Sequence, residues 1–66
     1  MDIVTIAASE ELSEMKLNDL IGRKGKVAEV LYCKDGRTVR GAWVELLGKP
    51  YLNEQEWYIP NKSIVK

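Results

Sequence analysis

The chain has 66 residues, with ten basic side chains, ten acidic side chains and no histidine, and 45% of its residues are hydrophobic. A chain of this length has room for one small domain with a single core. The lack of histidine excludes most hydrolytic mechanisms that use an imidazole base. The lone cysteine cannot supply the roughly four thiol or imidazole ligands of a zinc site. We therefore expect no enzyme activity, no metal and no cofactor.

The sequence also gives an expectation for the compartment. No stretch approaches the ~20 apolar residues that cross a bilayer. The N-terminus carries Asp2 where a secretory signal peptide has basic residues. Cys33 has no second cysteine to pair with, which fits a reducing compartment, and we interpret it as a small buried hydrophobe. These features predict a cytoplasmic protein with no membrane partner.

Residues 1–16 are predicted to form an N-terminal arm, either a strand or a short helix. Residues 3–6 read Ile-Val-Thr-Ile, and such β-branched runs favour a strand. Ser9 is a typical helix N-cap, and Glu10 and Glu11 fall in the first turn, where carboxylates suit the helix dipole. A helix over 9–15 is too short to be stable without tertiary support. A mobile arm is the alternative.

The next segment predicts a turn and then a hairpin. Gly22 and Gly25 are expected to bracket a tight basic turn, followed by a strand over 26–33. Val27 and Val30 are three residues apart, so that only a bulge or a sharp bend would turn both inward. The dipeptide Asp-Gly at 35–36 predicts a hairpin turn with both residues at positive φ.

Residues 38–66 are predicted to add the remaining strands. In the strand over 38–47, alternation places Ala42, Val44 and Leu46 on a core face and Trp43 on the other, while Gly41 suggests a close backbone approach. Residues 51–55 are expected to be a loop, and 56–59 a strand with Trp57 facing the core. Proline 60 ends that strand, a single helical turn spans 61–63, and a closing strand spans 64–65. Short strands and tight turns at this spacing predict a small, bent antiparallel barrel.

Two segments resemble known families. The sequence Gly-Arg-Lys-Gly-Lys-Val-Ala-Glu-Val at 22–30 is similar to the KOW motif of ribosomal and transcription-elongation proteins. The sequence Trp-Tyr-Ile-Pro-Asn-Lys-Ser-Ile-Val at 57–65 resembles the end of a Src-homology-3 barrel. Both resemblances imply an all-β fold: a five-stranded, partly open Src-homology-3-like (SH3-like) barrel over residues 17–66, with the N-terminal arm appended.

Charge is unevenly distributed along the chain. Residues 1–15 carry four acids and no base, residues 16–40 carry seven bases and three acids, and residues 41–66 balance at three each. Several cations on one surface are what phosphate recognition requires. The alternative is that the acidic head and basic centre neutralise each other, or that the basic face is merely solvated. The candidate nucleic-acid contacts, which would converge at one barrel end, are Arg23, Lys24, Lys26, Arg37 and Arg40.

Zero net charge favours a protein partner over nucleic acid. Our leading hypothesis is a non-catalytic module for protein–protein interaction or a small accessory subunit, with a strand edge open to a partner strand. The candidate contact residues are Trp43, Tyr51 and Tyr58, of which Tyr51 is expected to be the most exposed. The alternative for Trp43 is that it caps the core, as is expected of Trp57. Residues 3–6 could be the pairing strand, either within the chain or between two copies, and we expect a monomer or a weak homodimer. Nucleic-acid binding through the KOW-like turn is the alternative.

Overall fold

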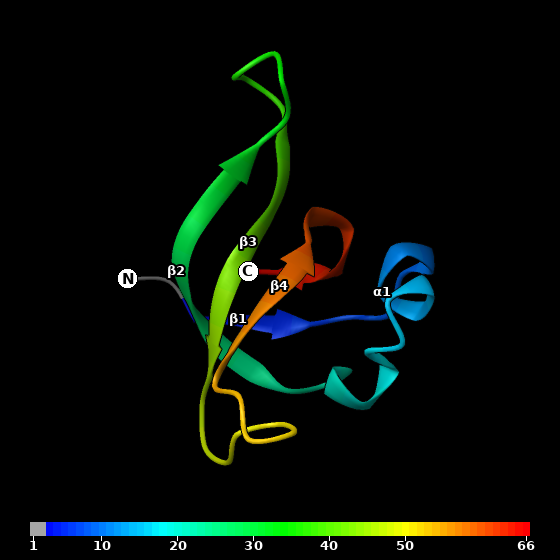
Figure 1. Ribbon diagram of the computed structural model, residues 1–66, viewed down its shortest axis with the longest axis vertical. Helices are drawn as coiled ribbons and strands as arrows, with labels where there is room; N and C mark the ends of the chain where they lie inside the picture. Colours follow the sequence, from blue (N-terminus) through cyan, green and yellow to red (C-terminus); the bar gives the residue numbers. More distant parts are fainter. Residues whose placement is uncertain (1–2) are drawn as a thin grey trace.

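A computed structural model describes residues 3–66 and shows one antiparallel sheet with the strand order β4-β3-β2-β1-β5 (Figure 1). A short helix and two 3-10 turns join the strands. The all-β prediction agrees with this architecture. The sheet is not closed, because β4 and β5 form its two edges, and the SH3-like barrel stays a prediction. The elements are β1 (Ile3–Ile6), α1 (Glu10–Glu14), η1 (Asn18–Leu20), β2 (Lys24–Tyr32), β3 (Val39–Leu46), β4 (Glu56–Pro60), η2 (Asn61–Ser63) and β5 (Ile64–Val65).

Strand β1 is an inner strand of the sheet. It pairs with β2 on one side, with Val4 opposite Gly25, and with β5 on the other, with Ile6 opposite Ile64. Val4 and Ile6 are buried. The predicted arm over 1–16 thus supplies both the strand and the short helix, and its residues 1 and 2 lie outside the described part of the chain. The boundary between this arm and residues 17–66 stays a prediction.

Ser9 caps α1, as its sequence position predicts. Its side-chain oxygen accepts a hydrogen bond from the backbone N–H of Leu12 at 3.1 Å. The Ser9 hydroxyl also lies 2.5 Å from the hydroxyl of Ser63, a buried residue at the end of η2. The side chain of Leu12 is buried in the core. A helix of five residues therefore obtains the tertiary support that it needs.

The core lies on the inner face of the sheet, which α1 and η1 cover (Figure 1). The predicted core face of β3 is confirmed, since Ala42, Val44 and Leu46 are all buried. Side chains from β1, α1 and η1 complete this layer. The buried hydrophobic residues are Val4, Ile6, Leu12, Leu17, Leu20, Ala42, Val44, Leu46 and Ile59.

The first half of β2 differs from its prediction. Gly25 lies within the strand, opposite Leu46, and not at the end of a turn. A Cβ atom at this position would lie 2.8 Å from the backbone oxygen of Glu45, so only glycine lets the two strands pack here. The turn before β2 places Gly22 at φ +88°. Gly22 therefore supplies the positive φ of the turn, whereas Gly25 allows β2 and β3 to pack closely.

The second half of β2 runs beyond the core. A bulge lies between Val27 and Glu29, as the spacing of the valines predicts. Val30 also faces inward, since it lies opposite the buried Ala42, but it is not buried, because 41% of this residue is exposed. In Figure 1 the upper half of the β2–β3 hairpin projects past the other strands, where no layer covers it.

The hairpin at 33–38 forms, but its turn is not the predicted one. Gly36 has φ +73°, whereas Asp35 keeps a negative φ. The Asp35 carboxylate accepts hydrogen bonds from the N–H groups of Thr38 and Arg37 and from the Thr38 hydroxyl, which together lower the pKa of Asp35. Cys33 is exposed, so the prediction that it is buried is wrong.

Candidate functional site

Two rows of side chains share the outer face of the β2–β3–β4 sheet. Residues directly opposite each other in antiparallel strands point to the same face. The register places Trp43 between Glu29 on β2 and Tyr58 on β4, and places Glu45 between Lys26 and Glu56. Trp43 is 39% exposed. We call these six residues the outer face: Lys26, Glu29, Trp43, Glu45, Glu56 and Tyr58.

In the aromatic pair on the outer face, contacts within the fold hold Tyr58 in place, whereas Trp43 is exposed. The rings of Trp43 and Tyr58 meet edge to face, with centroids 6.2 Å apart. The Tyr58 hydroxyl donates to the backbone oxygen of Arg40 at 3.2 Å, and the Arg40 guanidinium lies 5.4 Å from the centre of the ring. The Tyr58 ring also covers Gly41, where a Cβ atom would lie 2.6 Å from its hydroxyl. These contacts fix Tyr58 and leave the Trp43 indole facing solvent.

The charges around Trp43 are mainly negative. Glu29 is its direct neighbour on β2, Glu45 follows two residues later on the same face, and Glu56 lies opposite Glu45. Lys26 supplies one positive charge to the same two rows. Three carboxylates outnumber the Lys26 ammonium and the Arg40 guanidinium over Tyr58, so the local field favours cations over phosphate.

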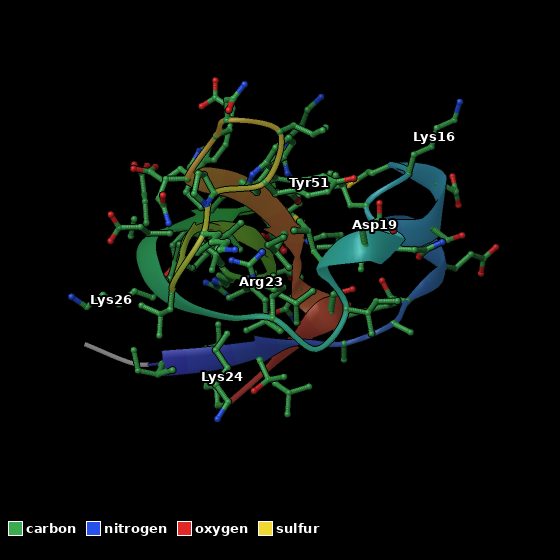
Figure 2. All side chains as sticks on the ribbon, turned by 90° about the horizontal axis from the view of Figure 1, so that it is seen from below. Lys16, Asp19, Arg23, Lys24, Lys26 and Tyr51 are labelled. Carbon is green, nitrogen blue, oxygen red and sulfur yellow. The ribbon has the colours of Figure 1, made fainter. Side chains whose placement is uncertain are left out.

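Tyr51 does not belong to this face. It is half-buried and packs on Trp57 with ring centroids 5.4 Å apart, so its expected exposure is wrong. Its hydroxyl donates to the Asp19 carboxylate at 3.0 Å (Figure 2), and this hydrogen bond raises the pKa of Tyr51. Trp57 packs against the core, as predicted, and its indole N–H donates to the backbone oxygen of Glu54 at 2.9 Å. This inner pair tethers the β3–β4 loop to η1.

The first three basic candidates lie near the start of β2, but their side chains are not directed to one surface (Figure 2). Arg23 is half-buried, and its guanidinium donates to the backbone oxygens of Leu47, at 3.0 Å, and Lys49. Both bonds come from Nη2 of Arg23, and they hold the loop after β3. The side chains of Lys24 and Lys26 extend outward in different directions (Figure 2).

The other two basic candidates lie far from these three. Arg37 is in the hairpin turn, at the opposite end of the molecule from the start of β2 (Figure 1). Arg40 is engaged with Tyr58 on the edge of the outer face. The five residues are therefore not gathered at one end of the sheet.

The three glutamates of the outer face were not among the predicted site residues. The two-residue spacing of Trp43 and Glu45, and of Glu56 and Tyr58, is a sequence signal that places each pair on one face. The position of Glu29 opposite Trp43 has no such signal, because it depends on the bulge after Val27. The outer face is therefore assembled by tertiary pairing.

Elsewhere in the described structure there is neither a ligand pocket nor a metal-binding cluster that could be an alternative functional site. Residues 3–66 contain no pocket and no cluster of three or more His, Cys, Asp or Glu side chains placed to hold a metal ion. In the same range, none of the helices is both long and apolar enough to cross a membrane. No family model, curated protein or solved structure matches the chain. The outer face is therefore the candidate functional site.

Proposed function

We propose that this protein is a non-catalytic module that binds another protein through its outer face, alone or as an accessory subunit. The observation that supports this function is the exposure of Trp43 beside a fixed Tyr58. The core lies on the opposite face of the same strands, so the fold does not need this indole for its interior. Exposed tryptophan and tyrosine on a rigid sheet are the residues that protein interfaces favour as anchors.

We also propose that the architecture is SH3-like. Three features support it: the strand order, the pairing of β1 with β5, and the single 3-10 turn η2 between β4 and β5. This relationship adds nothing to the choice of partner, since one fold carries many functions.

Nucleic-acid binding through residues 22–30 remains the competing prediction. The carboxylates beside Trp43 disfavour a phosphate backbone there, and the Nη2 group of Arg23 is bound to the loop after β3. A titration with labelled RNA and DNA at two salt concentrations tests it. Binding that weakens steeply with salt, and again in Arg23→Ala, would favour nucleic acid over protein.

The proposed function is tested by photo-crosslinking in the native host cell. A benzophenone amino acid replaces Trp43 in one variant and Leu52 in a control, because Leu52 is 71% exposed in the β3–β4 loop. We expect discrete protein adducts from position 43 and none of the same size from position 52. Identical adducts from both positions, adducts to nucleic acid only, or no adducts would contradict the proposal.

A further inference from the structure

The second half of β2 has a free edge. Among residues 3–66, strand β1 pairs with β2 over Lys24–Lys26, whereas β3 pairs with the opposite edge as far as Tyr32. Within residues 3–66, no strand pairs with the β1-side edge of residues 28–32. Backbone N–H and C=O groups on such an edge can accept an additional strand. We call residues 28–32 the β2 free edge.

The side chains along the β2 free edge are apolar apart from one acid. Val30 is 41% exposed, Tyr32 is 53% exposed and Leu31 is half-buried. Glu29 is exposed, and it begins the row that continues through Trp43 to Tyr58. A strand added here would extend this row by one residue, placed directly opposite Glu29.

We propose that the β2 free edge binds an extended segment of a partner protein by antiparallel strand addition, with a lysine or arginine of the partner opposite Glu29. This inference rests on the proposed function and specifies its partner. Opposite charges facing each other across two strands stabilise the pairing, and like charges destabilise it. The carboxylates of the outer face increase the preference for a cation.

Two-fold pairing of β2 with the β2 strand of a second copy does not satisfy this edge. Two-fold antiparallel pairing of β2 with itself centred on Glu29 places two Glu29 side chains opposite each other. The registers centred on the next three residues in turn place Glu29 opposite Leu31, Cys33 or Asp35. None of these registers gives Glu29 a cation, and two of them oppose like charges.

The apolar neighbours define the rest of the partner segment. The partner strand runs antiparallel to β2, so its successive residues lie opposite Leu31, then Val30 and then Glu29. Apolar side chains opposite Leu31 and Val30 would cover surface that is now exposed. The partner segment therefore reads apolar, apolar, basic in its own chain direction.

Two capped peptides serve as probes of this pattern: Thr-Val-Val-Arg-Thr and its control Thr-Val-Val-Glu-Thr. Each is titrated into the full chain while backbone amide shifts and amide hydrogen exchange are measured by NMR. We expect the arginine peptide to shift and protect amides of residues 28–32, and to bind about three- to tenfold more tightly than the glutamate peptide.

Charge reversal of the protein sharpens the test. Glu29→Lys should invert the preference, so that the glutamate peptide binds more tightly than the arginine peptide. Glu10→Lys makes the same change of charge at an exposed position of α1 and should leave the preference as in the wild type. Equal effects of the two variants would show that net charge, and not pairing at Glu29, causes the difference.

Other outcomes would overturn the inference. These are the absence of any peptide binding, equal binding of the two peptides, and shifts near Trp43 without protection of β2 amides. Protection that rises with protein concentration alone would identify a second copy as the occupant. If any of these occurs while position 43 still forms protein adducts, the inference fails and the proposed function stands.

Discussion

Two tryptophan–tyrosine pairs lie on opposite faces of β4. Trp57 and Tyr51 pack against the core, and both side chains donate hydrogen bonds within the fold. Trp43 and Tyr58 lie on the outer face, where Tyr58 is fixed and Trp43 faces solvent. Because Trp57 and Tyr58 are consecutive, one step along the strand separates a fold-stabilising ring from a surface ring.

The comparison shows that the face, and not the residue type, decides the role. Alternate residues of a strand point to opposite sides, and only one side of this sheet carries a core. A tryptophan on the inner side gains from burial. A tryptophan on the outer side keeps exposed surface that a partner can cover.

The largest expected effect on stability comes from removing the elements that cover the inner face of the sheet. Deleting residues 1–15 removes β1 and α1, and with them the buried side chains of Val4, Ile6 and Leu12. We expect no cooperative urea unfolding transition for residues 16–66, measured by circular dichroism. A transition with the wild-type midpoint would show that the first 15 residues are a dispensable arm.

Replacement of Trp57 with alanine tests the inner pair directly. The ring packs on the core and on Tyr51, so Trp57→Ala should lower the free energy of unfolding by about 3 kcal/mol, as measured by urea denaturation. A loss below about 0.5 kcal/mol, the usual range for surface substitutions, would remove the distinction between the two pairs.

Gly41→Ala tests the close approach beneath Tyr58. The new methyl group would lie 2.5 Å from the backbone oxygen of Ile59 and 2.6 Å from the Tyr58 hydroxyl. We expect a loss of about 1–3 kcal/mol in the free energy of unfolding, since the backbone of β4 must move. Adding Tyr58→Ala should recover only part of this loss, because the Ile59 oxygen remains; full recovery would assign the whole clash to the Tyr58 ring.

Tyr51→Phe should have a small effect that depends on pH. The hydrogen bond to Asp19 raises the pKa of Tyr51 in the folded chain, so its stabilising effect is present below the ordinary tyrosine pKa of about 10. That effect is lost as the pH rises through the raised value. The difference in urea midpoint between wild type and Tyr51→Phe should therefore shrink above about pH 10. A difference that stays constant through this range would mean that the hydroxyl does not stabilise the fold through Asp19.

Alternation along the strands predicts the faces of both tryptophans, although core capping was an open alternative for Trp43. The period of two in β3 assigned Ala42, Val44 and Leu46 to the core and Trp43 to the other face, and the same logic assigned Trp57 to the core. Local chemistry also sufficed for the Ser9 cap. Each of these depends only on neighbouring residues.

The errors arose where distant segments decide the outcome. Gly25 resembled a turn residue, but it is needed for the packing of β2 against β3. Val30 is apolar, as core residues are, but it stays exposed because the hairpin extends past the core at that point. Tyr51 lies in a loop, as expected, yet Asp19 and Trp57 draw it inward. The length of the β2–β3 hairpin likewise separates Arg37 from the basic residues at the start of β2.

The smallest effect on stability is expected for Trp43, and it tests the central claim most directly. Trp43→Ala should cost about 1 kcal/mol or less by urea denaturation, because the ring contributes an exposed cross-strand pair and no core contact. At equal folded fraction, crosslinking from a benzophenone side chain at the neighbouring position 58 should then lose the partner adduct. Unfolding of Trp43→Ala at a cost near that of Trp57→Ala, or an unchanged partner adduct, would contradict the claim that the outer pair serves a partner and the inner pair serves the fold.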